Sequence, residues 1–226
     1  FIMGSPETEV GRDSDEQLHE VTLTRDFLMY AYLVTQAEYE ALMSDNPSSR
    51  SGCPDCPVEN VSWFQGAAYC NALSTLEGLD QCYICTGSGH STDCEPSDAF
   101  ATPYDCPGYR LPLEAEWEHA ARSGDSRATY RGDLDGHGTG CNSPNAVLDP
   151  IAWFCGNASS PQPVGRLEPN AFGLYDMLGN LWEWVHDGFS DYGADPVTDP
   201  VGPNQRLDAV HRGSSWNFGA RDARAA

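Results

Sequence analysis

Cysteines are the residues of this 226-residue sequence with the clearest capacity for chemistry, and there are nine of them. Seven crowd into one stretch and a separate pair follows: Cys53, Cys56, Cys70, Cys82, Cys85, Cys94, Cys106, then Cys141 and Cys155. Two C-x-x-C pairs, at 53–56 and 82–85, superficially match a zinc ribbon. The gap between these pairs is somewhat long, and three more cysteines crowd the region. Disulfides in an oxidising compartment are therefore the favoured interpretation.

The pairing of the cysteines cannot be derived from the sequence. We expect Cys141–Cys155, together with Cys82–Cys106 or Cys85–Cys94, and the sequence also allows a Cys53–Cys56 bridge, although it would be tight. The odd count leaves one thiol over. Cys70 is the candidate, because it falls on a predicted helix, where burial would make it inert.

A second chemical signal lies at 174–184, where the sequence reads LYDMLGNLWEW. The turn brings together carboxylates and backbone carbonyls of Asp176, Gly179, Asn180, Leu181 and Glu183. Calcium takes hard oxygen ligands, including carbonyls from irregular backbone, so the segment is a candidate calcium site. The alternative is a structural turn whose Trp182 and Trp184 pack into the core.

Other polar segments give weaker signals. GDLDGHGTG at 132–140 is not an EF-hand loop, because the twelfth position from Asp133 is Pro144, where a bidentate Glu is required. We expect a solvated turn there. The six histidines lack a metal-ligand spacing such as H-x-x-x-H, and His119 and His186 are expected to be surface or packing residues.

The net charge of −22, from 34 acidic and 12 basic residues, excludes classes of partner. A phosphate backbone would be repelled, so nucleic-acid binding is not expected. No apolar run is long enough to span a bilayer. The acidic excess suits a solvated extracellular protein or one that binds cations.

The elements that position these residues begin with strands. His19 to Thr35 is rich in β-branched and aromatic residues and predicts one or two strands. Two helices then start with capping boxes: Thr35 with Glu38 begins a helix that runs to about Met43, and Ser62 with Gln65 begins the next.

A third helix is predicted at 113–122. Leu113 occupies its cap position and cannot accept an amide hydrogen bond, which should cost about 1 kcal/mol relative to Thr. Beyond Gly124 we expect turns and short strands. No repeat or linker is evident, so the chain predicts one α+β domain over 1–226.

Seven stretches in order resemble one family, the sulfatase-modifying factors, also called formylglycine-generating-enzyme-like proteins. They are FIMGSP at 1–6, VTQAEYEALM at 34–43, NPSS at 46–49, PVENVSWFQGAAYCNALS at 57–74, YRLPLEAEWEHAAR at 109–122, PNAFGLYDMLGNLWEWVHD at 169–187 and RGSSWNFGARDARAA at 212–226. The resemblance implies a fold related to C-type lectins, with little regular secondary structure and calcium ions that brace the loops. It also implies that the sequence is clipped at both ends.

The resemblance assigns two calcium sites. In the first, Asp176 and Glu183 would bind through side chains, and Gly179 and Leu181 through carbonyls. The second is a weaker match, with these residues as its two halves: Asn145 and Ala146, then Asn157 and Ser159. Asn157 there would replace an acidic ligand.

Formylglycine-generating members oxidise a cysteine of a sulfatase peptide and bind copper through two cysteines near the C-terminus. Soft thiolates suit Cu(I). Here Phe218 falls where the first thiol would be, and the second has no counterpart. We therefore expect no copper and no catalytic residues. The same segment would line a ligand groove with Trp216, Asn217, Phe218, Arg221 and Arg224. The alternative is that Trp216 packs into the core and Arg224 pairs with a carboxylate.

A related sulfoxide-forming branch uses a three-histidine iron centre, which the histidines here do not match. The sequence thus predicts an extracytoplasmic, secreted or cell-surface domain, bacterial in origin and stabilised by calcium. It would bind a protein or glycan, or self-assemble within a surface structure. The first alternative is a formylglycine-generating oxidase or a related oxidoreductase acting on a protein cysteine. The second is a purely structural domain.

Overall fold

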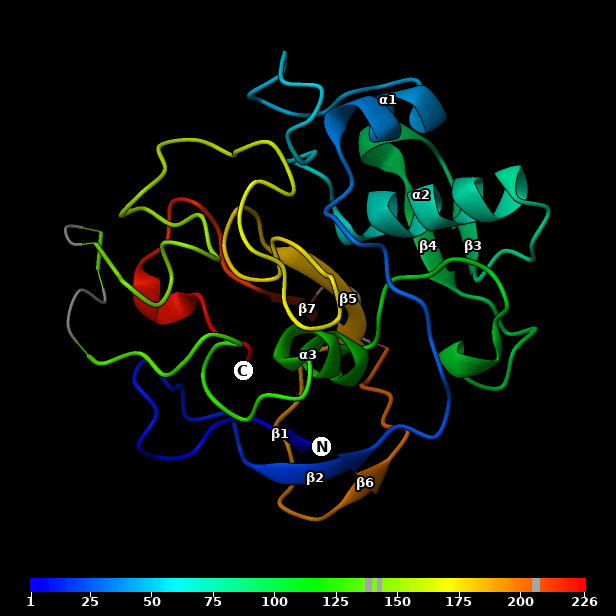
Figure 1. Ribbon diagram of the computed structural model, residues 1–226. Helices are drawn as coiled ribbons and strands as arrows, with labels where there is room; N and C mark the ends of the chain where they lie inside the picture. The colour runs from blue at the N-terminus through cyan, green and yellow to red at the C-terminus, as the bar shows by residue number, and fades with distance from the viewer. Residues whose placement is uncertain (137–139, 142–143, 205–207) are drawn as a thin grey trace.

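The computed structural model describes residues 1–136, 140–141, 144–204 and 208–226. Its strands are short and fall into separate small sheets (Figure 1). In the first sheet, β2 (His19–Thr22) lies between β1 (Ile2–Met3), which is antiparallel to it, and β6 (Val197–Thr198), which is parallel. The antiparallel pairs β3 (Tyr83–Thr86) with β4 (Asp93–Pro96), and β5 (Glu183–Gly188) with β7 (Ala209–Arg212), form the other two. The predicted α+β class with little regular structure is confirmed.

Two helices begin at the predicted capping boxes. At the start of α1 (Gln36–Met43), Thr35 Oγ1 accepts from Glu38 N at 3.2 Å and Glu38 Oε2 accepts from Thr35 N at 2.9 Å. Ser62 and Gln65 make the same exchange at the start of α2 (Trp63–Leu76). In Figure 1, α2 lies between α1 and the β3–β4 hairpin. Single 3-10 turns occur at Gly89–Ser91, Pro103–Asp105 and Ala220–Asp222.

The third helix, α3 (Glu114–Arg122), begins without a capping side chain at Leu113, as predicted. Leu113 is fully buried, and carboxylates from other positions satisfy the free amides beside it. Glu116 Oε2 accepts from Leu113 N at 2.8 Å, and Asp187 Oδ2, from β5, accepts from Glu114 N at 2.8 Å. Negative charge at a helix N-terminus is stabilising, so these contacts replace the missing cap.

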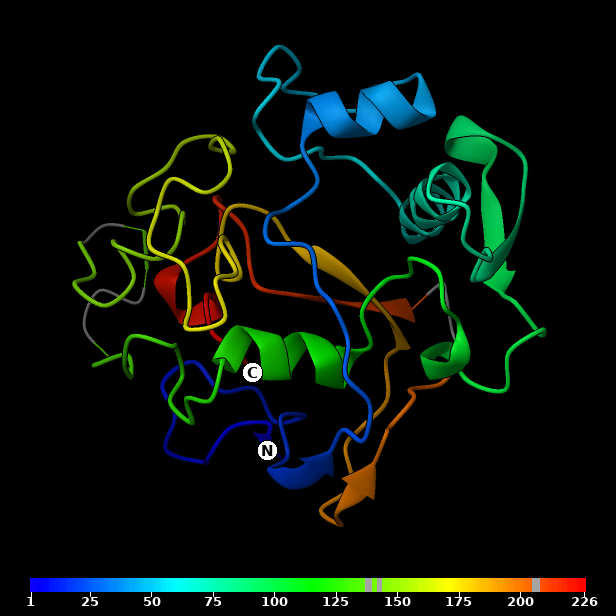
Figure 2. The ribbon, with the colours of Figure 1, turned by 45° about the vertical axis from the view of Figure 1, so that its right-hand side comes forward.

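The prediction of strands across His19–Thr35 is wrong beyond Thr22. Residues 23–35 run past α3 as an extended loop, drawn as a blue trace in Figure 2. Their backbone makes scattered single hydrogen bonds, such as Tyr175 N to Ala31 O and Val58 N to Val34 O, both 2.9 Å. The apolar side chains of this loop pack on the core instead of forming a ladder: Phe27 and Met29 lie against the cluster around Trp117 of α3.

The cysteines form the four disulfides Cys53–Cys56, Cys82–Cys106, Cys85–Cys94 and Cys141–Cys155, which leaves Cys70 free. Cys82–Cys106 and Cys85–Cys94, which were predicted as alternatives, both form. The zinc-ribbon interpretation is wrong. Cys85 and Cys94 face each other in the β3–β4 register, which explains why Cys85 does not pair with its neighbour in the C-x-x-C motif. Four disulfides indicate folding in an oxidising compartment.

Arg212 at the end of β7 holds the C-terminal residues against α3. Its guanidinium donates to Glu118 at 2.6 Å, to Glu114 at 3.2 Å and to the carbonyl of Ala225 at 2.7 Å. We call residues 212–226, which begin here, the C-terminal strip. None of the helices that the structure describes has the length and apolar character needed to cross a bilayer.

Candidate functional site

The segment 176–183 forms the tight turn that its sequence predicts. Asp176, Gly179 and Asn180 all have positive φ, at 56°, 79° and 58°. Asp and Asn tolerate this left-handed region better than other non-glycine residues. Gly179 is required for a second reason, because a Cβ there would lie 2.2 Å from the carbonyl oxygen of Trp153.

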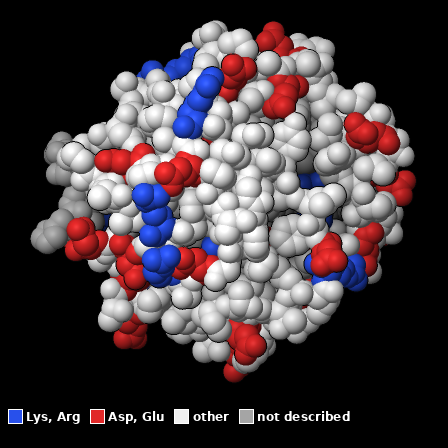
Figure 3. Space-filling view, in the orientation of Figure 1, with Lys and Arg blue, Asp and Glu red and all other residues white. Residues whose placement is uncertain are grey.

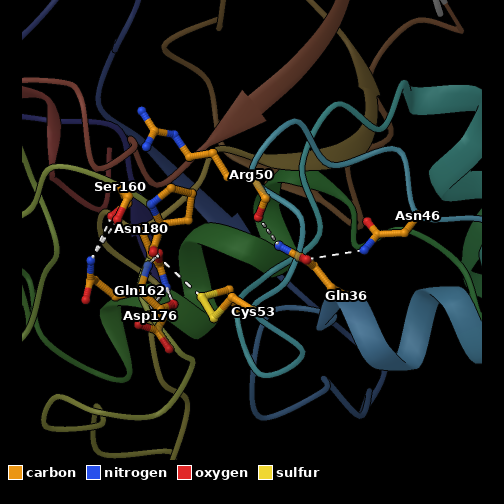
Figure 4. Close-up of a disulfide and its surroundings, with 10 residues drawn as sticks. Gln36, Asn46, Arg50, Cys53, Ser160, Gln162, Asp176 and Asn180 are labelled. Carbon is orange, nitrogen blue, oxygen red and sulfur yellow. Dashed lines mark hydrogen bonds between the residues drawn. A yellow bond between two sulfur atoms is a disulfide. The ribbon is translucent and has the colours of Figure 1, made fainter.

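Asn180 connects this turn to two other segments (Figure 4). Its side chain is fully buried, and it exchanges hydrogen bonds with the backbone of Gln162 at 2.9 and 3.1 Å. The backbone carbonyl of Asn180 accepts from Trp216 N at 2.9 Å and from Ser215 Oγ at 3.1 Å. Sequence reasoning placed Asn180 in the turn but missed this role, because its partners lie far away in the chain.

Asp176 and Glu183 supply two buried carboxylates to the turn. Asp176 Oδ2 accepts from Gly165 N at 2.7 Å, while burial raises the pKa of this group. Burial raises the pKa of Glu183 more strongly, to about 8, and the charge of Asp176 adds to the rise. The Trp117 indole lowers this pKa in part, but neither Trp117 Nε1 nor Glu183 Oε1 reaches hydrogen-bond geometry with a described residue.

These observations fit a bound cation at the turn. A buried carboxylate oxygen without a partner, beside a second buried carboxylate, is costly unless positive charge compensates it. Oxygen donors on irregular backbone suit Ca²⁺. Asp176 and Glu183 therefore remain candidate ligands, since the charge of Asp176 acts on Glu183, and ligation by the Gly179 and Leu181 carbonyls stays a prediction.

The Cys53–Cys56 disulfide supports the loop that contacts Asp176 (Figure 4). Cys56 Sγ lies 3.7 Å from Pro161 O, and Val164 N donates to Asp55 O at 2.9 Å. The carbonyl of Cys56 also accepts from Gln36 N, at the start of α1. The disulfide loop therefore ties α1 to residues 161–164, which directly precede Gly165, whose amide Asp176 binds.

The C-terminal strip presents aromatic rings at the surface. Phe218 is 42% exposed, and its ring packs edge-on against Trp182 with centroids 5.2 Å apart. Trp182 packs in turn against His211 at 4.7 Å. We call Phe218, Trp182 and His211 the aromatic cluster. Trp216 lies beneath the Arg50 guanidinium, 4.8 Å from its ring centroid, and Asn217 is exposed.

The two arginines assigned to the groove differ in their surroundings. Arg221 is exposed, 3.5 Å from Asp222. Arg224 is buried, and its hydrogen bonds go to the carboxylates of Glu9 and Glu16 and to backbone carbonyls. Arg224 lines a 260 Å³ cavity together with Trp182 and His211, but its guanidinium is occupied. The assignment of Arg224 as a ligand contact is therefore corrected to the alternative, a pairing with carboxylates.

No thiol lies on the strip, because residues 212–226 contain no cysteine. All nine cysteines of the chain are among the described residues, and eight of them are in disulfides. Cys70 packs with the Trp63 cluster on α2, where desolvation raises the pKa of its thiol to about 12. A thiol that resists ionisation is a poor nucleophile and a poor metal ligand. The prediction that Cys70 is the free cysteine on this helix is confirmed, and its raised pKa disfavours the reactive thiolate form.

The second set of calcium candidates shows local hydrogen bonding. Asn145 Oδ1 accepts from the amides of Val147 and Leu148, and Asn157 Oδ1 accepts from Phe154 N, each at 3.0 Å. Both amides thus stabilise turns, and calcium binding there with Ala146 and Ser159 stays a prediction. In the 132–140 segment, residues 137–139 lie outside the described residues. His186 is a packing residue beside Tyr83 and Trp63.

Comparisons with protein families and curated proteins give consistent matches. A family model described as the sulfatase-modifying factor enzyme 1-like domain matches residues 1–226. The chain is 33% identical over 195 residues to the chaperone protein LppX of Paenibacillus barcinonensis, covering 75% of this chain and 65% of that protein. It is 39% identical over 174 residues to a formylglycine-generating enzyme of Streptomyces coelicolor, covering 75% and 45%. The matches span less than two thirds of either relative.

Solved structures show the same fold. Treponema denticola variable protein 1 superposes with a TM-score of 0.75 and 29% identity, covering all of this chain and 84% of that one. PvdO from Pseudomonas aeruginosa gives a TM-score of 0.74 and 26% identity, covering all of this chain and 82% of that one.

Proposed function

Because this chain belongs to the sulfatase-modifying factor enzyme 1-like family, we propose that it is an extracytoplasmic, calcium-stabilised binding domain of that family without copper-dependent oxidase activity. The relatives include proteins named as enzymes and one named as a chaperone protein. One fold can carry several functions, so the site must decide between them. The four disulfides support the extracytoplasmic location.

The observation that carries this proposal is the exposed ring of Phe218 on a strip without thiols. The resemblance places the first copper-binding cysteine at this position, and a phenyl ring cannot ligate Cu(I). The only free thiol, Cys70, is partly buried against the separate cluster around Trp63. A site of this kind offers apolar contact instead of redox chemistry.

We expect no oxidation of a sulfatase peptide by this protein. The peptide, with its cysteine free, would be incubated with copper-loaded protein in air and examined by mass spectrometry for conversion of cysteine to formylglycine. The Streptomyces coelicolor formylglycine-generating enzyme is the positive control under the same conditions. Turnover of the peptide by the present chain would reject the non-catalytic assignment.

The ligand of the proposed binding surface is a protein segment or a glycan. Aromatic rings supply large contact areas at low cost in side-chain entropy and dominate many binding surfaces. The aromatic cluster offers such rings, and Trp216 of the C-terminal strip, with Arg50 over its ring, adds another aromatic group.

Replacing Phe218 with alanine is expected to weaken ligand binding about tenfold or more, because an anchoring aromatic residue contributes at least 1 to 2 kcal/mol. Arrays of oligosaccharides and of peptides would be probed with labelled protein, and binding to the strongest hit would then be titrated. Tyr109→Ala is the matched control, since Tyr109 is 40% exposed but lies outside the strip. Equal binding by Phe218→Ala and the wild type would remove the strip from the binding surface.

A further inference from the structure

The turn that contains the predicted calcium ligands is hydrogen-bonded directly to the C-terminal strip. Gly179 N donates to Gly213 O at 2.6 Å. The backbone carbonyl of Asn180 accepts from Trp216 N at 2.9 Å and from Ser215 Oγ at 3.1 Å. The candidate calcium site and the proposed binding surface are therefore joined by backbone contacts.

Three consecutive carbonyls of the turn have to be positioned together. Those of Gly179 and Leu181 are the predicted calcium ligands, and that of Asn180, between them, binds the strip. Planar peptide groups leave only two soft dihedral angles per residue. An ion that fixes the first and third carbonyls therefore also restricts the second, which accepts two hydrogen bonds from the strip.

The strip has a strained backbone where it meets the turn. Ser214 is fully buried and has a φ of 73°, in the left-handed region that non-glycine residues rarely adopt. The residues on both sides of it, Gly213 and Ser215, are hydrogen-bonded to the turn. Such strain persists only where surrounding contacts enforce it. Loosening of the turn would therefore let Ser214 relax, and the strip would shift with it.

Trp182 connects the turn to the aromatic cluster through its side chain. Its two neighbours in the chain, Leu181 and Glu183, are predicted calcium ligands. Its ring packs against Phe218 of the strip, with centroids 5.2 Å apart, and against His211, at 4.7 Å. The position of this ring depends on the backbone of the turn, so the turn acts on the aromatic cluster by a second route.

The surface charge favours the approach of a divalent cation. The chain has a net charge of −22, and Asp and Glu side chains are spread around the face shown in Figure 3. A negative potential raises the local concentration of cations. Calcium is the cation that suits oxygen ligands on irregular backbone. We therefore take calcium as the effector of the turn.

We propose that calcium binding at the turn controls the aromatic cluster, so that ligand binding at the C-terminal strip depends on calcium. This inference rests on the calcium-stabilised binding function proposed above and adds a coupling between its two sites. An effector shifts a binding site only through different affinities for the two conformations of the element between them. That element is the turn. Because coupling is reciprocal, a ligand on the strip must tighten calcium binding by the same factor.

Amide hydrogen exchange, followed by nuclear magnetic resonance, tests the coupling with calcium alone as the probe. In protein treated with EDTA, calcium is expected to slow exchange of the Trp216 amide about tenfold more than that of the Tyr83 amide. Tyr83 N is the matched control, because it is buried in β3, outside the strip, and donates to Asn71 Oδ1 at 3.1 Å. The comparison removes the protection that comes from general stabilisation of the fold.

Variants assign the effect to this turn. Glu183→Gln is expected to abolish the response of the Trp216 amide to calcium. Glu168→Gln should retain the response, since Glu168 pairs with Arg131 at the surface. A Glu183→Gln variant that responds like the wild type would overturn the role of the turn.

Isothermal titration calorimetry on the same samples separates the coupling from the calcium site itself. Calcium binding with equal changes at Trp216 and Tyr83 would overturn the coupling and leave the calcium-stabilised fold standing. Absence of calcium binding would overturn both. The peptide or oligosaccharide that binds most strongly in the arrays provides the final measurement, and equal affinity with and without calcium would also reject the coupling.

Discussion

Replacing Gly179 with alanine is expected to destabilise the protein by about 3 kcal/mol or more. The left-handed conformation alone costs a non-glycine residue about 1 to 2 kcal/mol. The added Cβ would also lie 2.2 Å from Trp153 O and 2.8 Å from Trp153 N, which are backbone atoms that cannot rotate away. The turn would have to move, and with it the hydrogen bond from Gly179 N to Gly213 O.

Gly173→Ala separates the two contributions. Gly173 has φ of +81°, similar to that of Gly179, but a Cβ there would meet no atom within 4 Å. This variant should lose only the conformational part, about 1 to 2 kcal/mol. The free energies of unfolding from urea titrations provide the comparison. Equal losses in the two variants would show that the close approach to Trp153 is unimportant.

Adding calcium to the protein after treatment with EDTA is expected to raise its melting temperature. A ligand that binds only the folded state at 100 times its dissociation constant stabilises that state by about 2.7 kcal/mol. The physical reason is the buried pair of carboxyl groups of Asp176 and Glu183. Burial raises the pKa of both, and a bound cation would stabilise their charged forms. Differential scanning calorimetry with increasing calcium measures the effect.

Glu183→Gln should abolish this calcium response. In the protein without calcium, the same substitution should be nearly neutral at pH 7, because burial raises the pKa of Glu183 to about 8 and the carboxyl group is already mostly protonated there. Glu168→Gln is the matched control, since Glu168 pairs with Arg131 at the surface and should leave the response intact. A wild-type melting temperature that calcium does not change would contradict the site.

Local sequence signals predicted the parts of the fold whose partners lie close along the chain. The capping boxes at Thr35 and Ser62 each need residues only three positions apart, so the starts of α1 and α2 are encoded in four-residue segments. The turn around Gly179 was recognised for the same reason. Its carboxylates and glycine lie within eight residues of each other.

Predictions failed, or stopped short, where distant residues decide the outcome. The loop at 23–35 has strand-like composition, but no neighbouring strand continues beside it, so its apolar residues pack on the Trp117 cluster instead. The family resemblance placed Arg224 in the ligand groove. Only the fold shows that Glu9 and Glu16, which lie 215 and 208 positions away in the chain, bind its guanidinium. Composition alone contains no information about such pairings.

The sequence by itself determined the family, the α+β class, the helix starts and the lack of thiols on the C-terminal strip, because these depend on residue types and short spacings. Only the tertiary structure decided which cysteines pair, that Asn180 joins the turn to Gln162 and Trp216, and that Glu9 and Glu16 enclose Arg224. These features depend on which surfaces meet when the chain collapses. That outcome is fixed by packing across the whole fold and not by any short segment.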